Sequence, residues 1–127
     1  MKENKISIKI NCPIKEVFKF TINPKSTPKW IDGIVKEETN EWPVKIGTIY
    51  RNKSDDNIWN EYGLVEFEPE KLFTLKQKNS NYSVQYTYKS LSENLTELTY
   101  YEWVDKGELE NPFTIKTLEK LKQILEK

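Results

Sequence analysis

Apolar and polar residues alternate along much of the chain, most clearly in Tyr82–Ser90, which reads YSVQYTYKS. Tyr82, Val84, Tyr86 and Tyr88 fall on one parity, and polar residues fill the other. Successive side chains of a strand point to opposite faces, so this pattern predicts a strand with one buried face. Three of the four residues on that face are phenols, and each buried hydroxyl needs a hydrogen-bond partner.

The same reasoning predicts a seven-stranded sheet. The turns between successive strands are too short for crossovers, so neighbouring strands should be antiparallel. The strand near 58–67 is ambiguous: Tyr62 and Leu64 share one parity, Gly63, Val65 and Phe67 the other, and a bulge near Gly63 would reverse part of it. The predicted strands are 5–10, 33–40, 48–53, 58–67, 72–78, 82–91 and 97–104.

Helical spacing appears at two places in the chain. After the first strand, Pro13 suits a first helical turn, and Ile14, Val17 and Phe18 recur at three-to-four spacing. A single further turn should deliver Trp30 to the core.

The chain closes with a predicted long helix. Asn111 suits its cap and Pro112 its first residue, with an apolar stripe at Ile115, Leu118, Leu121 and Leu125. Such a helix has only the inner surface of the sheet to bury against, which predicts an α+β fold.

Composition narrows the function classes. Basic and acidic residues balance at 20 each, so no net field favours nucleic acid or an anionic membrane. The sequence shows no secretory pattern and no apolar run that could span a bilayer. Cys12 is the only cysteine, which fits a reducing compartment, so we expect a cytoplasmic protein without membrane insertion or nucleic-acid binding.

The chain contains no histidine, which removes the commonest general base and the usual zinc sites. Asp55 and Asp56 read as a hairpin turn, and no glycine-rich phosphate loop is present. We therefore expect no metal and no cofactor. Cys12 at a helix start could have a lowered thiol pKa, although a small structural residue is the simpler interpretation.

Four other side chains could carry function. Glu102 shares a parity with Leu98 and Tyr100, so burial there would raise its pKa and make it a candidate acid or base. Arg51 could bind a carboxylate, but it should face solvent if Tyr50 faces inward. Two tryptophans on outward parities could mark a partner surface, so monomer and homodimer both stay open; these are Trp59 and Trp103.

Several segments together resemble the START-like superfamily, also called the polyketide cyclase/dehydrase and lipid-transport or SRPBCC superfamily. They are INCPIKEVFKFTINPKSTPKWIDGI, VKIGTIYRN, YGLVEFEPEKLFTL, LTELTYYEW and the terminal helix. The resemblance implies a helix-grip fold over residues 1–127 as one ligand-binding domain, in which a curved antiparallel sheet grips the long helix and encloses a cavity. It favours Tyr62 and Leu64 as inward-facing, and it implies that 105–113 borders the cavity entrance. Such folds host carriers, lipid-transfer domains and cyclases alike.

A cavity would explain the tyrosines, because water or a ligand could satisfy their hydroxyls; the alternative is that they are ordinary core residues. The expected cavity wall is Tyr50, Tyr62, Leu64, Tyr82, Val84, Tyr86, Tyr88, Leu98, Tyr100, Glu102, Phe113, Leu118 and Leu121.

Three functions follow as hypotheses. The first is binding of a small hydrophobic or amphipathic ligand, such as a lipid, an aromatic compound or a polyketide-like molecule. The second is a metal-independent cyclase or dehydratase in which Glu102 and a cavity tyrosine move protons. The third is a protein-interaction domain with a vestigial cavity, for which we expect a filled interior.

Overall fold

The computed structural model describes all residues 1–127. Seven strands and three helices form an α+β fold, as the alternation and helical spacing predicted. The elements are β1 (Lys2–Ile10), α1 (Ile14–Ile22), α2 (Thr27–Trp30), β2 (Ile34–Thr39), β3 (Ile49–Ser54), β4 (Trp59–Glu68), β5 (Leu72–Gln77), β6 (Tyr82–Ser92), β7 (Leu95–Val104) and α3 (Ile115–Leu125).

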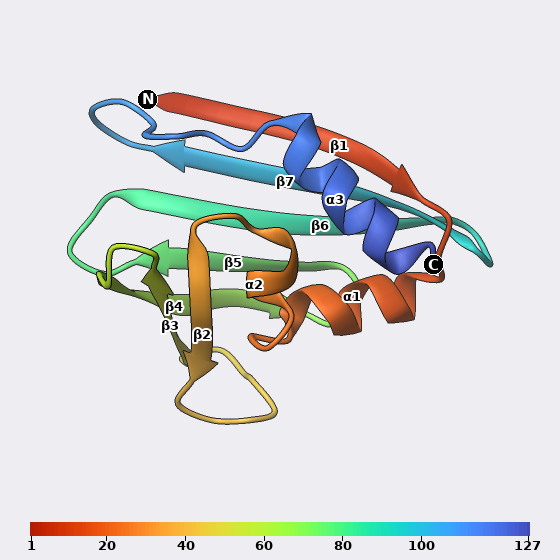
Figure 1. Ribbon diagram of the computed structural model, residues 1–127, viewed down its shortest axis with the longest axis horizontal. Coiled ribbons are helices and arrows are strands. Elements are labelled where there is room, and N and C mark those ends of the chain that lie inside the picture. Colours follow the sequence, from red (N-terminus) through yellow and green to blue (C-terminus); the bar gives the residue numbers. More distant parts are fainter.

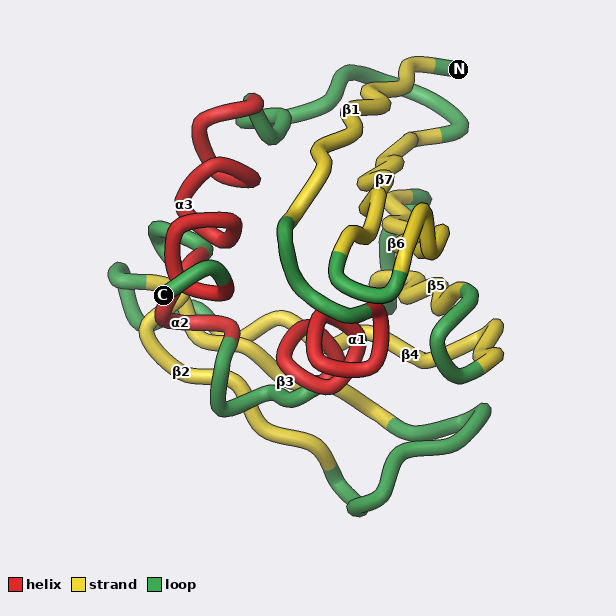
Figure 2. The backbone as a smooth tube through the Cα atoms, turned by 90° about the vertical axis from the view of Figure 1, so that its right-hand side faces the viewer, coloured by secondary structure: helices red, strands yellow, loops and turns green.

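The strands form one antiparallel sheet in the order β1-β7-β6-β5-β4-β3-β2 (Figure 1). Each strand from β2 to β6 pairs with the next one in the chain, as short connections require, and β1 pairs with β7. Figure 2 shows the sheet curling around α1 and α3. Helix α3 packs against β1 and α2, and α2 packs against β2, so the helices bridge the two edges of the curled sheet.

The terminal helix is shorter than predicted and begins later. It has 11 residues, about 17 Å at 1.5 Å per residue, with Thr114 as its N-cap. Asn111 has a left-handed φ of 50° and does not cap the helix. The Phe113 N–H donates to Glu102 at 2.8 Å, and its ring stacks on Tyr100 at 4.1 Å. These tertiary contacts hold the chain extended where the local sequence favours a helix start.

A bulge settles the orientation of β4. Leu64 pairs with Leu75 and Glu66 pairs with Thr74, so Val65 is the extra residue and is exposed. Tyr62 and Leu64 face the concave side, and beyond the bulge Phe67 also turns inward. One bulge therefore lets both apolar parities of this strand contribute to the core.

The core lies between the concave face of the sheet and the helices. Val17 of α1, Leu98 of β7, and Leu118 and Leu121 of α3 are 0% exposed. Ile115, at the start of the predicted stripe, is exposed because the helix begins there. None of the three helices has the length and apolar character needed to cross a bilayer.

Candidate functional site

A cavity of about 90 Å³, partly open to solvent, lies on the concave face of the sheet. Its wall is mainly apolar and aromatic, which is typical of small-molecule sites. Seven residues of the expected wall line it: Tyr50, Tyr62, Tyr82, Val84, Tyr86, Tyr100 and Phe113. Sequence reasoning missed the other eight, which are Thr21, Thr27, Ile31, Ile34, Glu37, Asn52, Phe73 and Leu75.

The other expected wall residues face the concave side but do not line the cavity. Side chains of α1 and α3 pack closely into one part of the space on the concave side of the sheet. A residue that faces inward in that part contacts these helices instead of the cavity. Alternation shows which face a residue is on, but not how far along the strand the helices reach. The residues in question are Leu64, Tyr88, Leu98, Glu102, Leu118 and Leu121.

Most of the inward-facing phenols have hydrogen-bond partners within the protein. The Tyr50 hydroxyl donates to the Ile22 carbonyl at 2.7 Å, and the Tyr88 hydroxyl lies 2.5 Å from the Thr21 hydroxyl. Tyr86 also lines the cavity, but it differs from these two tyrosines because its hydroxyl bonds to no protein group. Burial raises the pKa of these three phenols well above the usual range, so they are protonated at neutral pH.

Glu37 of β2 is the only charged residue in the cavity wall. Its Oε1 accepts a 2.6 Å hydrogen bond from the Thr27 hydroxyl, and its Oε2 accepts a 3.3 Å bond from Asn52 Nδ2. No lysine or arginine pairs with it, although the chain has 20 basic residues. Burial raises the pKa of Glu37 to about 7, with the two hydrogen bonds opposing part of that effect.

Glu37 also lines an outer groove of about 390 Å³, so its carboxyl group lies at the boundary between the cavity and the surface. A bulge in β2 explains why the sequence pattern did not predict that Glu37 faces inward. The β2–β3 register shifts between Ile34 and Lys36, which places Glu37 opposite Asn52 on the concave side. Four consecutive polar residues, 36–39, carry no alternation from which this shift could be read.

Glu102 lies on the concave face next to Tyr100, 1% exposed, but all its hydrogen bonds are to protein groups. Its Oε2 accepts from Asn4 Nδ2 and from the Phe113 N–H, both at 2.8 Å. Its Oε1 accepts from the Tyr82 hydroxyl at 2.8 Å. Glu102 therefore connects the segment before α3 to β1 and β6, and its hydrogen bonds stabilise the fold.

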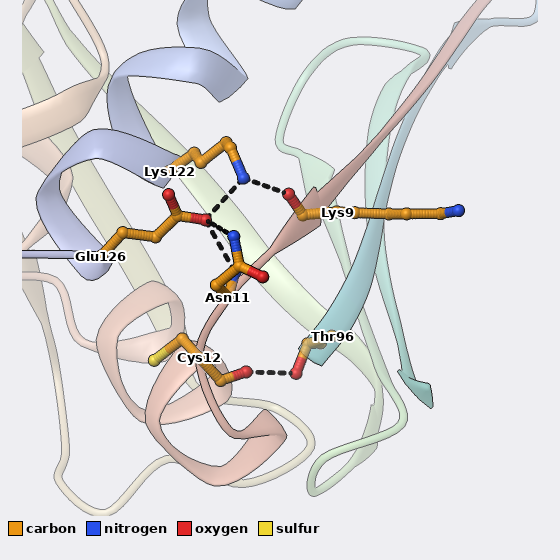
Figure 3. Close-up of polar contacts among 6 residues, drawn as sticks. All are labelled: Lys9, Asn11, Cys12, Thr96, Lys122 and Glu126. Atoms are coloured by element: carbon orange, nitrogen blue, oxygen red, sulfur yellow. Dashed lines mark hydrogen bonds and ion pairs between the residues drawn. The ribbon is translucent and has the colours of Figure 1, made fainter. Parts of the chain in front are cut away.

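Cys12 follows β1 in a polar junction with α3 (Figure 3). Its carbonyl accepts a 2.8 Å hydrogen bond from the Thr96 hydroxyl, while Glu126 accepts two bonds from the neighbouring Asn11 and pairs with Lys122. Burial and nearby carboxylates, Glu126 among them, raise the pKa of the Cys12 thiol. A lowered thiol pKa at this helix start is therefore wrong, and Cys12 fits the simpler interpretation of a small structural residue.

Arg51 lies on the outer face of the sheet, as the inward position of Tyr50 implies. It sits between Glu38 and Glu61, at 3.9 and 3.8 Å, with its guanidinium over the Trp59 ring. Trp103 stacks on its outer-face neighbour Tyr101. Asp55 and Asp56 form the β3–β4 turn, and nowhere do three potential metal ligands of the histidine, cysteine or carboxylate kind come together.

The sequence matches no family model, and no curated protein matches it. Solved structures do match the fold. XoxI from Bacillus cereus superposes with a TM-score of 0.79 at 16% identity, over 98% of this chain and 96% of that one. The Aha1 dimer protein from Colwellia psychrerythraea gives 0.71 at 12% identity, over 99% and 97%.

The di-domain ARO/CYC protein BexL gives a TM-score of 0.68 at 15% identity, over 82% of this chain and 36% of that one. The fold fits the helix-grip kind. Identities this low show shared architecture alone, because proteins of one fold carry many unrelated functions. The curled seven-stranded antiparallel sheet expected from the sequence is thus present, and its gripped helix is the short α3.

Proposed function

We propose that residues 1–127 act as one ligand-binding domain that holds a small amphipathic molecule in the cavity of the concave face. The observation that carries this proposal is the Tyr86 hydroxyl, which lines an aromatic cavity without a protein partner. The cavity also contains the Glu37 carboxyl group, which has no cation partner. An apolar wall with a few polar groups is the usual composition of a small-molecule site.

The size of the cavity limits the ligand. A buried water needs roughly 10–15 Å³ of such space, so about 90 Å³ accommodates several waters or one compact chemical group. A long acyl chain would need much more room. Of the ligand classes that the sequence suggested, we favour a small aromatic or amphipathic compound whose remainder extends into the opening.

The two other hypotheses receive less support. All of the Glu102 hydrogen bonds are to protein groups and it does not line the cavity, so no observation favours proton transfer through it. The interaction-domain hypothesis expected a filled interior, whereas the structure contains a cavity.

Native mass spectrometry tests the proposal, with the gently purified protein compared with its denatured mass. We expect a reproducible excess mass that is lost in Tyr86→Trp, because the larger side chain fills the cavity. Thr87→Trp is the matched control, since Thr87 is the next residue of β6 and faces the outer side. Circular dichroism checks that both variants fold. No excess mass, together with no thermal shift across a library of small amphipathic compounds, would contradict the proposal.

A further inference from the structure

We propose that the ligand carries a cationic nitrogen, which the Glu37 carboxylate and the neighbouring tyrosine rings bind together. This inference rests on the proposed ligand-binding function and names the chemical class of the ligand. Three features of the cavity support it: the sign of its charge, its aromatic wall and its connection to the surface.

The first feature is an uncompensated negative charge. The wall contains one carboxylate and neither lysine nor arginine, and the Glu37 oxygens receive hydrogen bonds only from the uncharged Thr27 and Asn52. A carboxylate in a partly desolvated position is stabilised by an opposite charge within about 4–6 Å. The chain does not supply that charge, so a cationic ligand would. An anionic ligand would meet repulsion from Glu37, and the cavity wall offers it no basic group.

The second feature is the set of rings near this carboxylate. Tyr50, Tyr62 and Tyr86 all line the cavity with Glu37, and burial, with a smaller contribution from the Glu37 charge, raises the pKa of each phenol. The faces of aromatic rings attract cations, and desolvated sites strengthen that attraction. Because these phenols stay protonated, they offer ring faces and hydroxyl groups without adding charge. A carboxylate beside aromatic rings is a suitable environment for an ammonium group.

The third feature is access from solvent. Glu37 lines the outer groove as well as the cavity, so an ammonium group can reach it without crossing a dry interior. The other charged residues of the groove are Lys25 and Glu38. Lys25 forms no ion pair with Glu37, and Glu38 lies 3.9 Å from Arg51. Neither therefore occupies the position proposed for the ligand nitrogen.

Three compounds with one aromatic body test the inference: benzylammonium, benzyl alcohol and benzoate. Binding is measured at pH 8 by calorimetry or by chemical-shift titration. We expect benzylammonium to bind at least about tenfold more tightly than benzyl alcohol, and benzoate not to bind. Glu37→Gln should remove the preference for the cation, so that benzylammonium binds no more tightly than benzyl alcohol.

Glu61→Gln is the matched control, because it removes the same charge from a residue that pairs with Arg51 on the outer face and lines neither the cavity nor the groove. It should retain the preference for benzylammonium. A carboxyl group with a pKa of about 7 is about one tenth ionised at pH 6 and about nine tenths at pH 8. The affinity of the unmodified protein for benzylammonium should therefore rise about tenfold between these pH values, and that of Glu37→Gln should not.

The inference is overturned if benzylammonium does not bind, if benzyl alcohol binds as tightly, or if the two glutamine variants behave alike. These results are distinguishable from failure of the proposed function. Binding of benzyl alcohol that Tyr86→Trp abolishes, or an excess native mass from an uncharged compound, would keep the ligand-binding proposal and reject the cation.

Discussion

Glu37→Gln should stabilise the folded protein at alkaline pH and have little effect at acid pH. The pKa of Glu37 is raised from 4.5 to about 7 on folding, so the folded state holds this proton more tightly than the unfolded state does. The stability that the protonated carboxyl contributes is fully present below pH 4.5 and is lost as the pH rises through 7. Glutamine does not titrate, and its amide can still accept a hydrogen bond from Thr27.

The magnitude follows from the size of the shift. One pKa unit corresponds to about 1.4 kcal/mol, so a rise from 4.5 to about 7 gives about 3.5 kcal/mol as an upper limit. The Glu37 side chain is half-buried, and water screening reduces this value. We expect Glu37→Gln to raise the free energy of unfolding by about 1–3 kcal/mol at pH 8 and by about zero at pH 4.

Urea unfolding of the unmodified protein, Glu37→Gln and Glu38→Gln at pH 4, 6 and 8 measures the effect. The difference between the unmodified protein and Glu37→Gln cancels the titration of all other groups, so its pH dependence belongs to Glu37. Glu38→Gln should show no comparable rise, because Glu38 faces Arg51 on the outer side of the sheet. A difference that stays constant from pH 4 to pH 8 would refute the desolvation of Glu37.

Three further predictions concern the core. Tyr50→Phe should lower the free energy of unfolding in urea by about 1–3 kcal/mol, because it leaves the buried Ile22 carbonyl without its donor. Tyr86→Phe should change that free energy by less than about 0.5 kcal/mol. Equal losses would contradict the assignment of a protein hydrogen bond to Tyr50 and none to Tyr86. Leu118→Ala should cost about 2–5 kcal/mol, since Leu118 is 0% exposed, and a smaller loss would show that α3 is weakly packed. Cys12 should react with a thiol reagent about tenfold more slowly in the native than in the urea-unfolded protein, and equal rates would contradict its raised pKa and burial.

Sequence periodicity predicted the sheet because alternation recurs in several strands, most clearly in β1 and β6. The alternation of Tyr82, Tyr86 and Tyr88 places each of them on the concave side, as the burial of this strand shows. The start of α3 was not predictable in the same way. Asn111 and Pro112 form a good local helix start, but the contacts of the next residue with β7 keep the chain extended there.

The cavity was harder to predict than the fold, because its position depends on packing between distant elements. Leu98 and Tyr100 are both inward on β7, yet only Tyr100 lines the cavity. Glu37 illustrates a second limit. A bulge reverses the parity of β2, and a bulge within a run of polar residues leaves no mark on hydropathy. The position of Glu37 in the cavity wall could therefore not be predicted from the hydropathy pattern.

The phenols on the concave face have a physical role that aliphatic residues could not fill. The hydroxyls of Tyr50 and Tyr82 donate to fixed acceptors, the Ile22 carbonyl and Glu102, so their rings are held by a hydrogen bond as well as by packing. A leucine wall around the same space could relax into the void, which would lower the cost of an empty cavity. Anchored rings keep the space open before the ligand arrives, and a preorganised site loses less entropy on binding. Tyr86, whose hydroxyl has no such acceptor, is then a phenol that can hydrogen-bond to the ligand.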